Sequence, residues 1–266
     1  RIRGDVSSQF ISALMMVGPA LPAGLTLELE GRIGSRPYIE MTASLMKHFG
    51  VESSFSGSTI KVAPQSYASA EFTVESDWSA ASYWFAFAAL ADDADITLPG
   101  LWLNSLQGDR AIAELMISLG VNCERQKDGT VRLTKKDVEK HVAWDFIHCP
   151  DLAQTVAVVC AAKGITGTFK GLESLRIKET DRIRALQTEL RKLGADLIEE
   201  SSVWKVTPAQ ALPGAASFHT YEDHRMAMAF APLATKLKVT LDNPDVVRKS
   251  YPDFWNDLRG FGFEIG

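Results

Sequence analysis

The sequence has few cysteines, no long apolar run and no excess of positive charge, and each shortage excludes a class of protein. Three cysteines (Cys123, Cys149 and Cys160) in 266 residues have no paired spacing, which excludes a disulfide framework and fits a reducing cytoplasm. No stretch is apolar for long enough to span a bilayer, and the first residues do not have the pattern of a signal peptide. The net charge of −5 argues against partners such as nucleic acid or an anionic membrane.

Motifs for metals and nucleotides are missing as well. The five histidines are scattered, and no set of His, Cys and Asp has metal-ligand spacing, so we expect no metal and no cofactor. There is neither a Walker phosphate loop nor a dinucleotide fingerprint. With 46% hydrophobic and 23% charged residues, the chain has the composition of a globular protein with one large or two medium domains.

Four amphipathic helices are predicted from apolar residues that recur every three or four positions. Each stripe ends at a glycine that supplies the left-handed backbone of a helix C-cap. These glycines are Gly50, Gly120, Gly194 and Gly262, and their regular spacing indicates a sequence repeat. The stripes are Tyr38-Met41-Leu45-Phe49, Ile112-Leu115-Leu119, Ile183-Leu186-Leu190-Leu193 and Tyr251-Phe254-Leu258-Phe261.

The rest of each repeat follows the same period. A second helix, apolar nearly all round and therefore buried, begins after a Ser or Asp that suits an N-cap. These capping positions are Ser7, Asp77, Asp151 and Asp223. A short strand follows this helix, and two strands around a turn follow the glycine. The sequence therefore predicts an α/β fold of repeated units, with apolar helices inside and sheets outside.

We expect a domain boundary between residues 72 and 73. One unit lies in 1–72 and three lie in 73–266. Three units can close a pseudo-threefold domain, whereas one cannot. We therefore expect the chain to be a fragment, with two further units upstream of Arg1.

The run Arg176–Arg182 is predicted to open the third amphipathic helix. Lys178 and Arg182 are four residues apart, and Glu179 and Arg182 are three apart, so they can share one helical face. Two cations beside a carboxylate suit an anionic substrate that also needs a proton. The plain alternative is a solvated face of ion pairs.

Other polar residues stand where helices are predicted to begin, and helix N-termini favour anions. Arg225 begins an otherwise apolar helix, so its charge needs a partner. Asp151 in a site of cations can deprotonate a hydroxyl. Each of these residues also has a purely structural interpretation. Ser7-Ser8-Gln9, Ser35–Tyr38 and Asp151 can simply cap helices. His224 can be a core or capping histidine, and Lys249 can be a solvated loop lysine.

Taken together, these motifs resemble those of the EPSP synthase (3-phosphoshikimate 1-carboxyvinyltransferase) family. The resemblance covers the whole chain, which looks like the C-terminal two-thirds of a family member. The most specific motifs are Lys178-Glu179-Thr180-Asp181-Arg182 and Asp223-His224-Arg225-Met226-Ala227-Met228. Further matches, in the family's order, are Ser7-Ser8-Gln9, Ser35-Arg36-Pro37-Tyr38, Pro150-Asp151 and Lys249.

The resemblance implies the enolpyruvyl transferase fold, an inside-out α/β barrel-like arrangement of βαβαββ units around buried helices. Residues 1–72 would be the last unit of an N-terminal domain, and 73–266 a pseudo-threefold C-terminal domain. The implied reaction transfers the enolpyruvyl group of phosphoenolpyruvate to the 5-hydroxyl of shikimate-3-phosphate and releases phosphate, within aromatic amino acid biosynthesis. No cofactor or metal is implied. We expect small-molecule substrates as the partners, a monomer, and a fragment that alone has little or no activity.

The resemblance also implies roles for individual residues. The catalytic residues would be Asp151 at the 5-hydroxyl, Glu179 at the methylene proton and His224 in an assisting role. Shikimate-3-phosphate would be bound by Ser7, Ser8, Gln9, Ser35, Tyr38, Asp151 and Lys178. Phosphoenolpyruvate would be bound by Gln9, Arg182, Arg225 and Lys249. One departure is Ser174, which stands where some family members have Asn.

Two other interpretations of the sequence remain open. One is the sister enolpyruvyl transferase that acts on UDP-N-acetylglucosamine, which shares the fold and the donor but not the Lys178–Arg182 run. The other is a non-catalytic anion-binding module that kept the fold. The retention of both Asp151 and Glu179 among the cations speaks against a pure binder.

Overall fold

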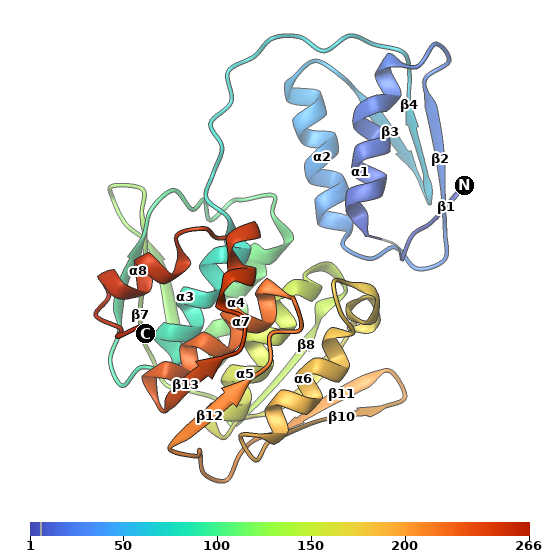
Figure 1. Cartoon of the computed structure of the whole chain (residues 1–266). Helices are drawn as coiled ribbons and strands as arrows, with labels where there is room; N and C mark the ends of the chain where they lie inside the picture. The colour runs from blue at the N-terminus through green and yellow to red at the C-terminus, as the bar shows by residue number, and fades with distance from the viewer. Residues whose placement is uncertain (6) are drawn as a thin grey trace.

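The structure, a computed structural model, describes residues 1–5 and 7–266 and consists of four α/β units in sequence (Figure 1). In the first unit a four-stranded sheet of order β1-β2-β4-β3 carries two helices. The strands β1 and β2 are parallel, and β4 runs antiparallel to β2. The elements of this unit are β1 (Ile2–Arg3), α1 (Ser8–Val17), β2 (Leu25–Glu30), α2 (Arg36–His48), β3 (Ser53–Ser56) and β4 (Thr59–Val62).

The second and third units repeat this order. Their sheets are β5-β7-β6 and β10-β11-β9-β8, and in both a hairpin strand pairs antiparallel with the strand that follows the buried helix. The second unit has α3 (Trp78–Leu90), β5 (Asp95–Leu98), α4 (Ile112–Ser118), β6 (Val121–Arg125) and β7 (Val131–Lys135). The third has β8 (His141–Asp145), α5 (Ala153–Lys163), β9 (Thr166–Lys170), α6 (Arg182–Arg191), β10 (Asp196–Glu200) and β11 (Val203–Thr207).

The fourth unit contains one parallel strand pair and two helices. Its elements are β12 (Ala215–Phe218), α7 (His224–Phe230), β13 (Lys238–Leu241) and α8 (Phe254–Gly260). The helices α3, α5 and α7 lie together inside the second to fourth units, and their side chains are buried almost all round, as the apolar sequence predicts. The four glycines predicted to end helices all have positive φ, between 80° and 92°.

Two hydrophobic cores divide the chain. One belongs to the first unit and includes Ile11 and Ile60, and the other runs through the remaining three units. Residues 63–77, which contain no helix or strand, link the two parts and include the predicted boundary. The division into domains stays a prediction.

The first unit touches the others at the start of α2. The Ser35 backbone N–H donates to the Ile147 carbonyl at 2.8 Å. Gly108 lies beside this bond, and there is no room for a side chain at its position. A Cβ added to Gly108 would lie 2.6 Å from the His148 carbonyl oxygen and 3.1 Å from the Tyr38 ring. The start of α2 therefore packs against loops of the second and third units.

Two of the predicted apolar stripes are partly wrong. The buried residues of α2 are Ile39, Thr42 and Met46, not the predicted stripe Tyr38-Met41-Leu45-Phe49. The polar Thr42 was not counted, but its hydroxyl contacts Ser12 Oγ at 2.7 Å and is satisfied inside the core. In the fourth stripe Phe261 is 55% exposed, because α8 ends at Gly260.

The Arg176–Arg182 run also differs from the prediction. The helix α6 begins only at Arg182, with Asp181 as its N-cap, so Lys178 and Glu179 lie in the preceding loop. Asp151 does not cap α5 either; it lies in a short 3-10 turn (Pro150–Leu152). Its carboxylate pairs with cations from other segments instead, since those charges compete more strongly than a backbone N–H for its oxygens.

Candidate active site

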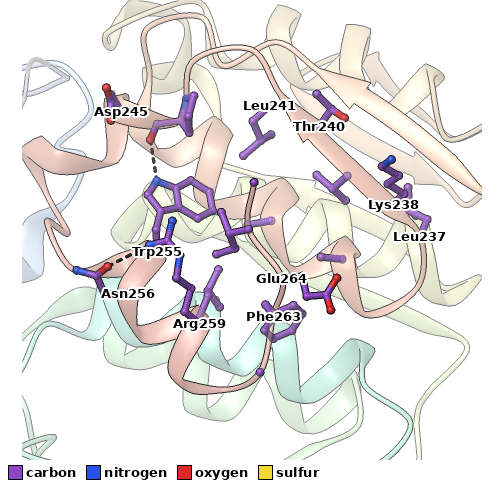
Figure 2. A pocket seen from close by; sticks show the side chains of 18 of the residues that line it. Leu237, Lys238, Thr240, Leu241, Asp245, Trp255, Asn256, Arg259, Phe263 and Glu264 are labelled. Atoms are coloured by element: carbon purple, nitrogen blue, oxygen red, sulfur yellow. Dashed lines mark hydrogen bonds between the residues drawn. The ribbon is translucent and has the colours of Figure 1, made fainter.

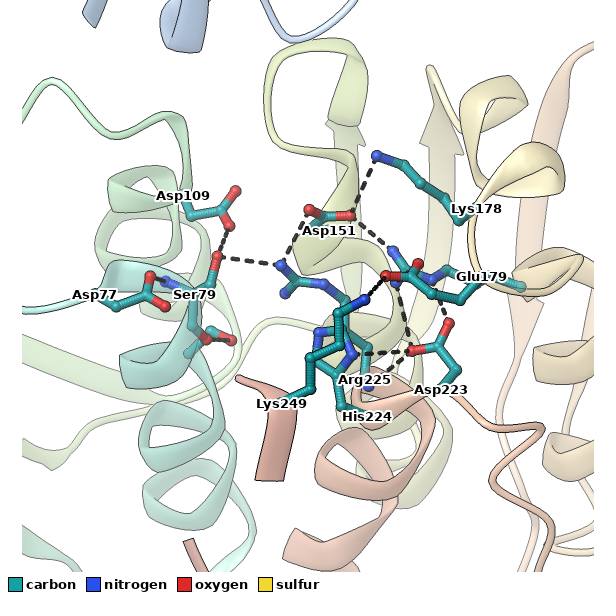
Figure 3. Close-up of polar contacts among 12 residues, drawn as sticks. Asp77, Ser79, Asp109, Asp151, Lys178, Glu179, Asp223, His224, Arg225 and Lys249 are labelled. Carbon is teal, nitrogen blue, oxygen red and sulfur yellow. Dashed lines mark hydrogen bonds and ion pairs between the residues drawn. The ribbon is translucent and has the colours of Figure 1, made fainter. Parts of the chain in front are cut away.

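Acidic and basic side chains meet where α6 and α7 begin (Figure 3). We use the name Arg182 cluster for Asp151, Glu179, Arg182, Asp223 and Arg225. They come from the turn before α5, the loop before α6, and the first residues of α6 and α7. The three-unit packing therefore collects residues that are up to 74 positions apart in the chain.

Arg182 is the centre of this cluster. Its side chain is 2% exposed, and it donates to three carboxylates: Asp223 at 2.6 Å, Glu179 at 2.7 Å and Asp151 at 2.8 Å. A buried guanidinium without partners would cost several kcal/mol, so these carboxylates compensate its burial. The same bonds fix the positions of the two proposed catalytic carboxylates, Asp151 and Glu179.

Asp223 orients both arginines. It is fully buried, caps α7 by accepting the Arg225 backbone N–H at 2.8 Å, and uses its other oxygen for Arg182 Nε. Tyr221 and Glu222, just before it, both have φ of 55°. Non-glycine residues seldom adopt this backbone, so the turn that presents Asp223 is strained and held by its surroundings.

Arg225 is also largely buried. Its Nη2 lies 3.0 Å from Asp151 Oδ2 and 3.5 Å from Ser79 Oγ. Burial disfavours the charge, but the nearby Asp151 carboxylate keeps the pKa of Arg225 well above its ordinary value. Arg225 therefore stays a cation, with the partner that the sequence argument requires.

Asp151 accepts from both arginines, and Lys178 Nζ lies 3.9 Å from it. Burial alone would raise the pKa of Asp151, but Arg225, Lys178 and Arg182 lower it to about 2. Asp151 is therefore ionised near neutral pH and can accept a proton.

Glu179 lies on the other side of Arg182, and Lys249 Nζ is 3.5 Å from its second oxygen. Burial raises the pKa of Glu179, but its own backbone N–H, Arg182, His224 and Lys249 lower it overall. His224 is buried 3.9 Å from Asp223, and burial lowers its pKa, so its imidazole is neutral at pH 7. The Lys249 side chain is 71% exposed, which leaves it accessible to a ligand.

Residues from the first unit approach this region from the other part of the chain. Ser7, Ser35, Ser174 and Lys178 line a small cavity of about 30 Å³ at the junction. Hydroxyls and an ammonium group there suit a phosphate, and the carboxylate of Asp5, which also lines the cavity, is paired with Arg3. Ser8 is half-buried and Gln9 is exposed on α1, and in the described chain neither side chain bonds to the Arg182 cluster.

Tyr38 reaches the three-unit part from α2. Burial, then the negative charges of Asp109 and Asp151, raise the pKa of Tyr38 well above its usual value. Its phenol is therefore a neutral hydrogen-bond donor beside the cluster.

A contact between Ser79, at the start of α3, and Asp109 was not predicted from the sequence. Asp77 caps this helix by accepting the Ser79 N–H at 2.8 Å, and the Ser79 hydroxyl donates to the buried Asp109. A cap at Asp77 was predicted from the repeat. Asp109 had no such signal, because it lies in a short 3-10 turn (Gly108–Ala111) outside every periodic pattern.

A larger cavity lies away from this cluster. It has a volume of about 800 Å³ and opens beside β13 and α8, where Leu241, Trp255 and Phe263 line it (Figure 2). Within the described chain β13 pairs only with the parallel strand β12, whereas β2, β5 and β9 each pair with an antiparallel strand of the hairpin in their own unit. The cavity thus follows from an open sheet edge. The Arg182 cluster, rather than this larger cavity, is the candidate active site because of its geometry.

Neither a metal site nor a membrane span is evident in the described part of the chain. No group of three or more His, Cys, Asp or Glu in residues 1–5 and 7–266 is arranged to hold a metal ion. None of the helices described there is long and apolar enough to cross a membrane.

The fold matches solved structures of enolpyruvyl transferases. EPSP synthase from Acinetobacter baumannii superposes with a TM-score of 0.72 at 18% identity, covering 96% of this chain and 60% of that one. The enolpyruvyl transferase NikO from Streptomyces tendae superposes with a TM-score of 0.64 at 19% identity, covering 94% and 58%. The predicted fold class is confirmed.

The chain belongs to the EPSP synthase (3-phosphoshikimate 1-carboxyvinyltransferase) family, whose model matches residues 1–258. A relative of that name from Bacteroides fragilis (strain YCH46) is 50% identical over 275 residues, covering 100% of this chain and 66% of the relative. One from Idiomarina loihiensis is 38% identical over 267 residues, covering 97% and 60%. The chain thus spans about two thirds of the length of the curated relatives it matches.

Proposed function

We propose that this chain supplies a large part of the active site of a 3-phosphoshikimate 1-carboxyvinyltransferase. The enzyme transfers the enolpyruvyl group of phosphoenolpyruvate to the 5-hydroxyl of shikimate-3-phosphate and releases phosphate. The observation that carries this proposal is the attachment of Asp151 and Glu179 to one buried guanidinium, at 2.8 and 2.7 Å. Two carboxylates held in fixed positions among cations match a reaction of two anionic substrates with two proton transfers.

In the addition step, Asp151 takes the proton of the 5-hydroxyl as the oxygen attacks C2 of phosphoenolpyruvate. Its pKa of about 2 keeps it ionised, and the cations that lower this pKa also hold it in place. Glu179 is the group for the methylene carbon, which gains a proton on addition and loses one on elimination. Phosphate then leaves from the tetrahedral intermediate.

The lowered pKa of Glu179 makes it a carboxylate before substrates bind. Phosphoenolpyruvate is an anion, and we propose that Arg182, Arg225 and Lys249 bind it. An anion there would compete for the donors that now hold Glu179 and would raise its pKa. Glu179 would then carry a proton at the stage when the methylene carbon needs one.

The acceptor side of the proposed site includes Ser7, Ser8, Gln9, Ser35, Tyr38 and Lys178. The small cavity at the junction supports this assignment for Ser7, Ser35 and Lys178. Ser174 lines the same cavity, so we propose that its hydroxyl replaces the amide of the Asn found in some family members. Gln9 lies farther along α1, and its role on both substrates rests on the resemblance. We further propose that His224 assists as a neutral imidazole.

A monomeric, cytoplasmic enzyme is part of the same proposal. All three cysteines are free, which is compatible with a reducing compartment.

Phosphate release from phosphoenolpyruvate tests the proposal. We would measure it with shikimate-3-phosphate and, separately, with UDP-N-acetylglucosamine, using residues 1–266 and the whole enzyme. The proposal predicts release with shikimate-3-phosphate only, and strongest from the whole enzyme. Release with the UDP-sugar would identify the sister transferase, and no release with either acceptor would leave an anion-binding module.

A further inference from the structure

Asp109 is a buried carboxyl group that the proposed mechanism does not use. Its side chain has no exposed surface, and the Ser79 hydroxyl donates to Oδ2. Its other oxygen, Oδ1, is also buried and has no hydrogen bond of regular geometry to any described residue. An acidic oxygen left without a regular partner is costly, so its retention beside the Arg182 cluster needs a reason.

The phenol of Tyr38 is the group that approaches this carboxyl from the other part of the chain. The Asp109 charge helps to raise the pKa of Tyr38, and Tyr38 helps to lower the pKa of Asp109, so the two side chains lie near each other although no regular hydrogen bond joins them. The backbone beside Asp109 is pressed against the same helix, since a Cβ on Gly108 would lie 3.4 Å from Pro37 Cβ and 3.1 Å from the Tyr38 ring. The contact therefore joins the start of α2 to the turn before α4.

The charged surroundings of Asp109 make this contact sensitive to pH. Burial, and then the Asp151 charge, raise the pKa of Asp109 to about 6, although Arg225, Ser79 and Tyr38 lower it. Those groups come from the turn before α5 and from α7, α3 and α2, and the Asp109 charge also helps to raise the pKa of the nearby Cys149 thiol. Near neutral pH the carboxyl is largely ionised and can accept the Tyr38 hydrogen.

We propose that Asp109 is a positioning residue that holds the phenol of Tyr38 at the acceptor side of the site, across the junction between the first unit and the three that follow. The inference rests on the proposed function, in which Tyr38 binds shikimate-3-phosphate. The carboxylate fixes the direction of the phenol hydrogen, and the phenol oxygen is left to accept a hydrogen bond from a hydroxyl of the substrate. Tyr38 then arrives already oriented when both parts of the chain meet the acceptor.

The kinetic test is a double-mutant cycle of Asp109→Asn and Tyr38→Phe in the whole enzyme. Each single variant should raise the KM for shikimate-3-phosphate about tenfold, the loss expected for one charge-assisted hydrogen bond, and the KM for phosphoenolpyruvate much less. The double variant should be no worse than the worse single one. Additive losses, or equal rises in both KM values, would overturn the proposal. Asp95→Asn, an exposed partner of Arg132 in the same unit, is the matched control.

A second readout does not depend on the substrate. In protein labelled with 13C at the tyrosine ring, the Tyr38 signal should titrate at lower pH in Asp109→Asn than in the wild type, because the Asp109 charge raises that pKa. In Tyr38→Phe labelled with 13C at the aspartate carboxyl, the Asp109 signal should titrate at a higher pH than in the wild type, because Tyr38 lowers that pKa. This measurement keeps the test open if Asp109→Asn does not fold. Both signals unchanged would overturn the contact even if the enzyme uses shikimate-3-phosphate. Shifted signals would support it even if the enzyme uses another acceptor.

Discussion

The first unit and the three that follow all contain a helix, a strand and a second helix in that order, yet the first of these helices differs sharply in environment between them. In α1, Phe10 is 64% exposed and Val17 is 56% exposed, whereas Phe85 in α3 has no exposed surface. The helices α3, α5 and α7 bury one another, while α1 packs on one side only, against α2 and its own sheet. Burial in this fold thus depends on how many units surround a helix, not on the unit itself.

The same difference separates the two halves of the proposed site. Arg182, Arg225 and Asp151 are held in the interior of the three-unit part, where the arginines lower the pKa of Asp151 and the Asp151 charge raises the pKa of Arg225. The first unit instead contributes hydroxyls and a phenol near its surface. In the proposed mechanism, the three-unit part would thus fix the reacting carboxylates, and the first unit would add contacts to the acceptor.

Two phenylalanine substitutions test the difference in burial most strongly. Phe85→Ala should lower the free energy of unfolding of the three-unit part by about 3–5 kcal/mol, since it leaves a cavity among α3, α5 and α7. Phe10→Ala, at an exposed position, should change the free energy of unfolding of the first unit by less than about 0.5 kcal/mol. Urea denaturation followed by tryptophan fluorescence measures both, and similar losses would contradict the account.

Two arginine substitutions compare a buried charge in the three-unit part with an exposed charge in the first unit. Arg182→Met should cost about 3–5 kcal/mol of stability, because it leaves Asp223 and its neighbours buried without a cation. The control Arg36→Met removes an exposed pair with Glu40 in α2 and should cost less than about 1 kcal/mol. Denaturation curves that shift equally would show that the Arg182 bonds do not stabilise the fold.

Glu179→Gln tests the role of the second carboxylate. It removes a proton carrier but no cation, so turnover should fall by about 10²-fold or more while shikimate-3-phosphate binding stays nearly intact. Stopped-flow kinetics and calorimetric titration separate the two quantities.

The control for this variant is Lys178→Ala, which should show the reverse pattern, with weaker acceptor binding as its main effect. If Glu179→Gln loses binding and turnover equally, Glu179 is a binding residue rather than a proton carrier.

The stability of the three-unit part should also depend on pH through Asp151. Its pKa is about 2 in the fold, below the value near 4 of an unfolded chain. A lowered pKa stabilises the folded state above pH 4, and that contribution is lost as the pH falls from 4 to 2. Over this range the wild type should lose about 2 kcal/mol more than Asp151→Asn. Parallel curves for the two proteins would refute the lowered pKa.

Much of the fold was predictable from the sequence. The glycine period, the apolar helices and the strands depend on local residue patterns that recur along the chain. Gly120 and Gly194, for example, end helices where expected. The stripe of α2 was not predictable in this way, because Thr42 is buried through a hydroxyl contact that comes from the fold.

The site was predictable as a set of residue types, but not in its contacts. Arg225 needed a partner on sequence grounds, yet only the fold shows that this partner is Asp151. The helical face expected for Lys178 and Glu179 is absent, since α6 begins at Arg182. Asp109 could not be predicted, because its significance arises from burial beside Ser79 and Tyr38, two residues far from it in the chain.

The central claim is that the carboxylates held by Arg182 carry out the proton transfers. We would test it by measuring phosphate release from the whole enzyme and from its Asp151→Asn variant, with both substrates saturating. The account predicts that the rate falls by about 10²-fold or more while the KM for phosphoenolpyruvate changes little, since only the acceptor of the 5-hydroxyl proton is lost. A rate within a few-fold of the wild type would contradict it.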